Sequence, residues 1–186
     1  MRIGILAVQG AFIEHEKVLT SLGCECVELR QASDLHDLDG LVLPGGESTV
    51  QGKLLHELGM FEPIKSMIEG GLPTLATCAG LILLAESISN DENVYFATLP
   101  VTVKRNAYGR QLGSFQRKSN FGDIEDFAFT FIRAPYIEKA AENVEILATV
   151  DERIVAARYK NQIGLAFHPE LGNDVRIHQY FLECIK

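Results

Sequence analysis

The first half of the chain alternates between short apolar runs and longer amphipathic segments. Residues 3–8 form a continuous apolar run, typical of a strand buried on both faces of a sheet. Residues 12–22 then show helical spacing and stop at Gly23. Further strands are expected at residues 25–29, 40–43 and 74–77, and further helices at 50–58, 61–69 and 79–86. This alternation predicts an α/β fold with a mostly parallel central sheet that is covered by helices on both faces.

The pattern changes after residue 95, where strand-like runs follow one another with few helices between them. These runs lie at residues 101–105, 127–132, 144–150, 154–159 and 163–167, and a closing helix is expected at 175–185. Strands that follow one another without crossover helices pair antiparallel, so we expect antiparallel strands in this second half. Because the 186 residues show no linker and no repeat, we expect a single domain over residues 1–186.

Composition argues against several classes of function. The net charge is −8 and no block of Lys and Arg occurs, so we expect neither nucleic acid nor a membrane as a partner. The apolar start is better explained by a buried first strand than by a signal peptide, and we expect a cytoplasmic protein. The four cysteines, at 24, 26, 78 and 184, lack further ligands at zinc-site spacing, so we predict no metal site.

Cys78 stands where an apolar run meets the start of a helical pattern. The residues at 76, 77, 79 and 80 are all small, as a sharp turn from strand to helix requires. Such a turn exposes a nucleophile and directs a helix N-terminus at it, which favours a thiolate. The alternative is a buried structural cysteine, which is the commoner role of a free thiol. A histidine farther along the chain favours the interpretation of Cys78 as a nucleophile.

That histidine lies in the segment Phe167-His-Pro-Glu170. Proline disfavours a helical conformation in the residue before it, so His168 is expected to be extended. Residues two apart in an extended chain point to one side, with Cα atoms about 6.6 Å apart, so Glu170 can hold the His168 ring in one tautomer. The alternative is a surface turn after a strand. The other histidines, at 15, 36, 56 and 178, are expected to be solvated or interfacial side chains.

Pro44-Gly-Gly-Glu-Ser48 follows another expected strand. Glycines there let backbone N–H groups approach a ligand closely, where they can stabilise an oxyanion or bind a carboxylate. The alternative is a plain connection in which Ser48 or Thr49 caps the next helix. The loop lacks the G-x-x-x-x-G-K-[ST] phosphate-binding pattern, and no G-x-G-x-x-G follows the first strand, which disfavours nucleotide binding.

Arginines near the ends of expected strands suit a substrate carboxylate, because a guanidinium offers a planar fork of donors. Arg105 and Arg133 are candidates for this role, and both are expected to be buried. The alternative is a salt bridge with one of the many acidic residues, and for Arg110 we favour that alternative.

Taken together, these segments resemble the class I, triad-type glutamine amidotransferases, and more narrowly the glutaminase subunits of pyridoxal 5′-phosphate synthases. The matching segments run through nearly the whole chain in the family's order: Leu6-Ala-Val-Gln-Gly-Ala11, Leu43-Pro-Gly-Gly-Glu-Ser-Thr49, Thr77-Cys-Ala-Gly-Leu-Ile82, Arg105-Asn-Ala-Tyr-Gly-Arg-Gln111, Phe131-Ile-Arg-Ala-Pro135 and Phe167-His-Pro-Glu-Leu171. The chain departs from the family at Ala76, where glycine is usual and where alanine resists a positive φ.

The resemblance implies a flavodoxin-like α/β fold and a set of site residues. It implies that Cys78 is the nucleophile, His168 the acid and base, and Glu170 the residue that orients the histidine. It further implies that glutamine contacts Gly46, Glu47, Ser48, Arg105, Ile132 and Arg133. Backbone N–H groups of Gly46 and Ala79 would form the oxyanion hole.

The implied reaction is hydrolysis of L-glutamine to L-glutamate and ammonia, with no cofactor. The resemblance also implies a partner, a barrel-shaped synthase subunit that combines the ammonia with pentose and triose phosphates, so that pyridoxal 5′-phosphate is the product of the complex. Docking of that subunit would order the loop at Gly45 and Gly46, and residues 9–11 would lie at the docking face. A different thiol hydrolase on the same architecture and a non-catalytic glutamine-binding module remain as alternatives.

Overall fold

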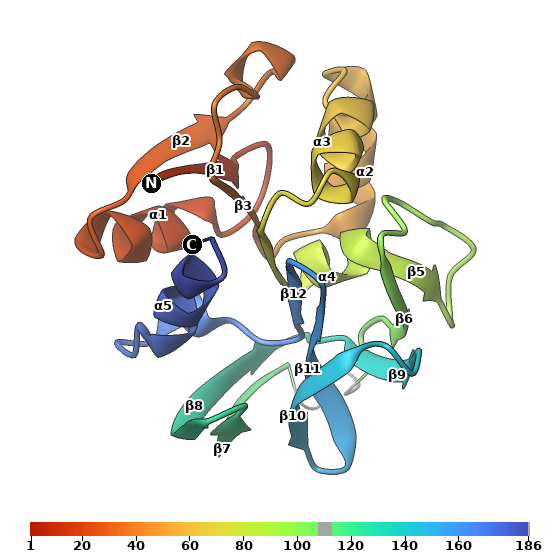
Figure 1. Ribbon diagram of the computed structural model, residues 1–186. Coiled ribbons are helices and arrows are strands. Elements are labelled where there is room, and N and C mark those ends of the chain that lie inside the picture. The colour runs from red at the N-terminus through yellow and green to blue at the C-terminus, as the bar shows by residue number, and fades with distance from the viewer. Residues whose placement is uncertain (108–112, 186) are drawn as a thin grey trace.

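The computed structural model describes residues 1–107 and 113–185 (Figure 1). The strands are Arg2–Leu6 (β1), Glu25–Leu29 (β2), Gly40–Leu43 (β3), Thr74–Thr77 (β4), Ala85–Ile88 (β5), Leu99–Lys104 (β6), Ser114–Phe121 (β7), Ile124–Ile132 (β8), Tyr136–Ala140 (β9), Glu145–Val150 (β10), Arg153–Tyr159 (β11) and Gln162–Leu165 (β12). The helices are Phe12–Ser21 (α1), Ser48–Glu57 (α2), Phe61–Glu69 (α3), Ala79–Leu84 (α4) and Arg176–Glu183 (α5), with short 3-10 turns at Ala32–Asp34 (η1) and Pro169–Leu171 (η2).

One large mixed sheet organises the described residues. Its strand order is β2-β1-β3-β4-β12-β11-β9-β6-β5, with β10 paired to β11 beside this path. The pairs β2-β1, β1-β3, β3-β4 and β4-β12 are parallel. In contrast, β11 is antiparallel to β12, β9 and β10, and β9 is antiparallel to β6. The expected fold class is therefore confirmed: an α/β fold with a mostly parallel half and antiparallel strands in the second half.

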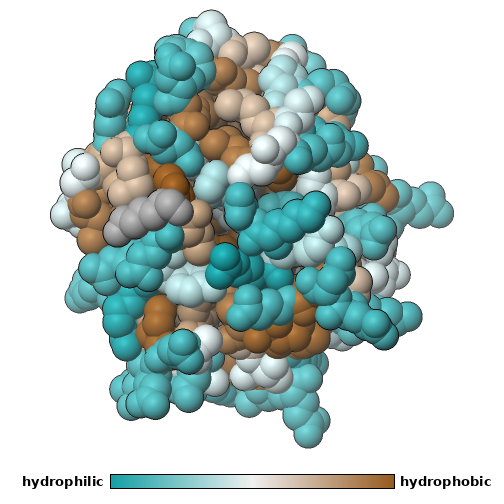
Figure 2. Space-filling model, in the orientation of Figure 1, coloured by the Kyte–Doolittle hydropathy of each residue, from teal (hydrophilic) through white to brown (hydrophobic). Residues whose placement is uncertain are grey.

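Helices cover both faces of the parallel half. Figure 1 shows α1 and α5 on one side of β1 and β3, and α2 and α3 on the other side. The strands β3, β4 and β12 are buried at every residue, which explains their continuous apolar runs. On the face of the molecule seen in Figure 2, hydrophilic side chains cover most of the surface and hydrophobic ones show between them.

The second half contains strands that the sequence did not predict. The helix expected over 79–86 ends at Leu84, because Ala85 turns extended and β5 then pairs in parallel with β6. Two further strands, β7 and β9, were missed. β7 pairs with β8 in a separate two-stranded ribbon, and most of its residues are polar and at least partly exposed.

The topology brings four loops to one edge of the sheet. Because β1, β3, β4 and β12 are parallel neighbours, their carboxyl ends lie at the same edge. The segments that leave this edge begin at residues 7, 44, 78 and 166. They carry the Gly45–Gly46 loop, Cys78, His168 and Glu170.

Within the described residues, none of the helices combines the length and the apolar character that crossing a membrane requires.

Candidate active site

Cys78 occupies a sharp turn between β4 and α4. Its backbone has φ 50° and ψ −101°, a conformation uncommon for a residue with a side chain. The Cys78 N–H donates to the Leu165 carbonyl at 2.8 Å, and the Ile82 N–H donates to the Cys78 carbonyl at 3.3 Å. The residue is 8% exposed and lines a cavity. A strained turn that holds a thiol at a cavity wall is typical of a nucleophile.

The small residues around Cys78 are needed for close packing. A Cβ at Gly80 would overlap the carbonyl oxygen of Leu43, so α4 packs this closely against β3 only with glycine there. Ala76 lies fully buried within β4, and the residue with positive φ is Cys78 itself. Alanine at 76 therefore meets no conformational penalty, and the departure from the family pattern leaves the turn intact.

His168 and Glu170 form a buried pair just after β12. The His168 backbone, with φ −113° and ψ 87°, is non-helical, as the following proline requires. Its Nδ1 lies 2.7 Å from Oε1 of Glu170, whose side chain is fully buried. The His168 N–H donates to the Thr130 carbonyl at 2.8 Å, which ties the segment to β8. The structure thus brings the ring and the carboxylate together.

The electrostatics of this pair favour a charged imidazole. Burial by itself would lower the pKa of His168, but hydrogen bonding to Cys78 and Glu170 outweighs it and raises the pKa to about 10. Burial likewise opposes ionisation of Glu170, but the neighbouring rings of His15 and His168 hold the pKa of this carboxyl below its ordinary value. Glu170 is therefore a carboxylate that faces a protonated ring at neutral pH.

Two histidines that were expected to be solvated or interfacial are fully buried, so that prediction was wrong for His15 and His178. Nε2 of His15 lies 3.5 Å from Oε2 of Glu170 and 3.2 Å from Oγ1 of Thr77. Its Nδ1 lies 3.0 Å from Nε2 of His178. The signal was present in the spacing, because His15 and Leu19 are four residues apart on the one buried face of α1.

The loop at residues 44–48 packs directly against the catalytic candidates. A Cβ at Gly45 would overlap the His168 ring and lie 3.4 Å from the Cβ of Cys78. The Ala11 N–H donates to the Gly45 carbonyl at 3.0 Å, and the Glu47 N–H donates to Oε1 of Gln9 at 2.8 Å. The helix cap is Glu47 and not Ser48 or Thr49, since α2 begins at Ser48. The loop is thus tied to the segment after β1.

The arginines lie at the cavity but are not both buried. Arg133 has a side chain that is 73% exposed, against expectation, because it sits in an outward turn with φ 41° directly after β8. Its Nη2 lies 3.9 Å from Oε1 of Glu47. Arg105 is more enclosed and forms an ion pair with Asp91. Arg110, for which we favoured a salt bridge, lies outside the described residues.

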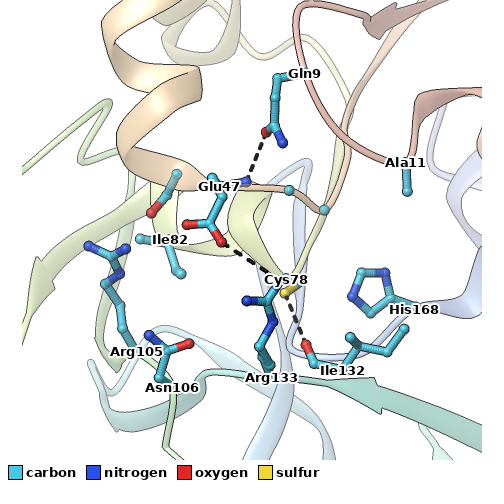
Figure 3. Close-up of a pocket in the computed structure, with 13 residues that line it drawn as sticks. Gln9, Ala11, Glu47, Cys78, Ile82, Arg105, Asn106, Ile132, Arg133 and His168 are labelled. Atoms are coloured by element: carbon cyan, nitrogen blue, oxygen red, sulfur yellow. Dashed lines mark hydrogen bonds and ion pairs between the residues drawn. The ribbon is translucent and has the colours of Figure 1, made fainter. Parts of the chain in front are cut away.

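A cavity of about 240 Å³ joins these elements (Figure 3). All of the predicted site residues line it except Glu170 and Ala79. Glu170 contacts the His168 ring, and Ala79 follows Cys78 in the sequence. Figure 3 shows the Cys78 sulfur beside the His168 ring, and Sγ lies 3.9 Å from the Ile132 carbonyl. Gln9 and Asn106 also line the cavity. Gln9 could have been found from its place after the first strand.

A protein-family model and several known proteins are similar to this chain over almost its whole length. The model of the SNO glutamine amidotransferase family matches residues 5–186. The chain belongs to the SNO glutamine amidotransferase family. It is 67% identical, over its whole length and 94% of the relative, to the pyridoxal 5′-phosphate synthase subunit PdxT of Desulfitobacterium hafniense. It is 55% identical to the subunit of the same name from Methanocorpusculum labreanum, over its whole length and 98% of the relative.

A solved structure of a glutamine amidotransferase superposes on this family member with a TM-score of 0.94. The two chains are 40% identical, and the match covers 98% of each. The agreement extends over both the parallel half of the sheet and the antiparallel half. The resemblance to glutamine amidotransferases that the sequence motifs indicated is therefore confirmed at the level of the family and the fold.

Proposed function

We propose that this chain, as a single domain, is the glutaminase subunit of a pyridoxal 5′-phosphate synthase and hydrolyses L-glutamine to L-glutamate and ammonia. The observation that carries the proposal is the placement of the Cys78 thiol in one cavity with His168, whose ring is hydrogen-bonded to the buried Glu170. A thiol, an imidazole and an orienting carboxylate are the parts of a covalent acyl-transfer site. Membership of the glutamine amidotransferase family supports glutamine as the acyl donor.

The proposed reaction has two steps. The Cys78 thiolate attacks the side-chain amide carbon of glutamine, and backbone N–H groups of Gly46 and Ala79 receive the developing oxyanion. The C–N bond then breaks while His168 donates its proton to the departing ammonia, which leaves a γ-glutamyl thioester on Cys78. In the second step His168 removes a proton from water, the water oxygen attacks the thioester, and the C–S bond breaks to release glutamate.

Opposite charges at the cavity mouth suit a free amino acid. Glu47 and Arg133 face one another with 3.9 Å between Oε1 and Nη2, and both side chains are more than half exposed. An L-glutamine zwitterion offers an ammonium to the carboxylate and a carboxylate to the guanidinium. Arg105, held by Asp91, presents a second cationic group, and Ser48, Gly46 and Ile132 complete the proposed contacts.

The protonation state of His168 gives a direct test of the thiol–imidazole coupling. A pKa raised from 6.5 to about 10 means that the charged ring persists through neutral pH and is lost only as the pH rises through the higher value. In a ¹⁵N NMR titration of the free enzyme, we expect His168 to remain protonated at pH 8. In Cys78→Ala the pKa should fall, because the hydrogen bond with Cys78 is its largest stabilising cause. Titration of the wild-type ring near 6.5 would contradict this coupling.

The ammonia is proposed to pass to a separate barrel-shaped synthase subunit, which combines it with pentose and triose phosphates. The loop that carries Gly46 is tied to residues 9–11 by the Ala11–Gly45 and Gln9–Glu47 hydrogen bonds. A partner that contacts residues 9–11 can therefore reorient the proposed oxyanion donor. The cytoplasmic location stays a prediction from the sequence.

This coupling predicts that the glutaminase depends on its partner. We expect kcat for glutamate release to rise by about a hundredfold when the cognate synthase subunit is added, the value of one oxyanion-hole donor. The assay measures glutamate at saturating glutamine with and without that subunit, and a barrel protein of unrelated function serves as the control. Equal rates in both arms would argue against the coupling, and the absence of glutamate in both would argue against the glutaminase itself.

A further inference from the structure

Behind the proposed triad lies a buried cluster of polar side chains that the mechanism above does not use. His15 comes from α1, His178 from α5 and Thr77 from the last position of β4, next to Cys78. All three are fully buried. Buried polar groups are costly unless they are paired, so an arrangement that spans three elements calls for a physical explanation.

Burial favours the neutral form of both rings of the cluster at neutral pH. Burial lowers the pKa of His15, against the opposing effect of Glu170, and lowers the pKa of His178 to about 3. Within the part of the chain that the structure describes, no group of His, Cys, Asp and Glu side chains has the arrangement that holds a metal ion. The two rings therefore act as hydrogen-bonding groups, each with one donor and one acceptor nitrogen.

The hydrogen-bond pattern fixes where the two protons lie. Nδ1 of His178 is buried and has no hydrogen-bond partner among the described residues. A proton there would be an unpaired buried donor, so His178 carries its proton on Nε2 and donates it to Nδ1 of His15, 3.0 Å away. His15 must then carry its own proton on Nε2. That N–H lies between Oγ1 of Thr77 and Oε2 of Glu170.

The carboxylate of Glu170 needs such a neighbour. Its Oε1 is bound by His168, whereas Oε2 is buried and makes no hydrogen bond of ordinary geometry within the described residues. Nε2 of His15 lies 3.5 Å from Oε2, which is longer than an ordinary hydrogen bond. A small movement closes this contact, and active-site contacts often tighten when substrate binds.

We propose that His15, held in its Nε2–H tautomer by His178, is a positioning residue that supplies the second donor to Glu170 and so fixes the carboxylate that orients His168. The inference rests on the proposed glutaminase function. His15 does not line the cavity, so it acts through Glu170 and not on glutamine. Held at both oxygens, the carboxylate cannot rotate away from the His168 ring.

The experiment compares two substitutions that separate a donor from a space-filler. His15→Gln keeps an N–H donor, and His15→Leu fills the space without one. With the synthase subunit present, we expect kcat for glutamine hydrolysis to fall by about ten- to a hundredfold in His15→Leu and by less in His15→Gln, with KM unchanged in both. A purely structural role predicts the reverse order, because glutamine buries a polar amide where leucine buries none.

A matched control removes packing from the same face of the same helix. Leu19 is also fully buried and lies one turn after His15 on α1. We expect Leu19→Val to lose stability but to keep kcat within about twofold of wild type. A comparable loss of kcat in Leu19→Val would overturn the proposal. A kcat of His15→Leu that equals or exceeds the kcat of His15→Gln would overturn it as well. Inactive wild-type protein would instead refute the glutaminase function.

The tautomer can also be measured in the wild-type protein, which needs neither activity nor a variant that folds. Long-range ¹H–¹⁵N NMR correlations distinguish the two neutral tautomers of a histidine ring. We expect both His15 and His178 to be neutral with the proton on Nε2 at pH 7. A proton on Nδ1 of His15, or a charged His15 ring, would exclude the donation to Glu170 and with it the positioning role.

Discussion

Replacing Cys78 with alanine is expected to reduce kcat for glutamine hydrolysis by a factor on the order of 10⁴ to 10⁶, because loss of a nucleophile removes the covalent route altogether. The measurement is glutamate release in the presence of the synthase subunit. Overall stability should change little, since the thiol lies at a cavity wall, where water can replace its contacts with the His168 ring and with the Ile132 carbonyl at 3.9 Å.

The chain offers a matched control for this substitution. Cys24 has the same exposed fraction as Cys78, 8%, but lies just before β2 and outside the cavity. Cys24→Ala should therefore keep its activity. A glutamine analogue with an electrophile in place of the side-chain amide should label Cys78 and leave Cys24 unmodified, as detected by peptide mass. Substantial glutamate release by Cys78→Ala would refute the nucleophile assignment.

Local sequence patterns predicted the parallel half of the fold and the centre of the candidate site. The strands β1, β3 and β4 are buried on both faces, so their apolar runs are continuous and easy to detect. His168 has the non-helical backbone that the following proline predicts, although Glu170 reaches its ring from the 3-10 turn at Pro169–Leu171 and not from an extended segment. Both kinds of inference depend only on short stretches of chain.

What the sequence did not predict depends on contacts between distant segments. β7 is a strand because it pairs with β8 in an exposed ribbon, and its polar residues give little period-two signal. Arg105 pairs with Asp91, one of many acids in the sequence, so no local rule could select that partner. His15 is buried because His178 and Glu170 meet it there, although its polarity alone suggested solvent.

The second large effect on kcat is expected from Gly45→Ala, and its cause is steric. No positive φ requires glycine there, so alanine is allowed by the backbone. Its Cβ, however, would overlap the His168 ring, which must then move relative to Cys78. A displacement of about 1 Å in a reacting group can cost a hundredfold in rate, so we expect Gly45→Ala to lose at least about that much in kcat. Stability should fall by only about 1–3 kcal/mol, typical of local overpacking.

Gly172→Ala provides the comparison for Gly45→Ala. Gly172 follows η2, and a Cβ there would meet only the Asp174 nitrogen, at an ordinary 3.8 Å. We expect kcat of this variant to stay within about twofold of wild type. For both variants, kcat is measured together with the rate at which the electrophilic analogue labels Cys78. Slow labelling in Gly45→Ala means that the thiol–imidazole pair has been forced apart, because the reactive thiolate depends on that pair. If Gly45→Ala instead labels and turns over like Gly172→Ala, the close packing of the loop on His168 is not required for catalysis.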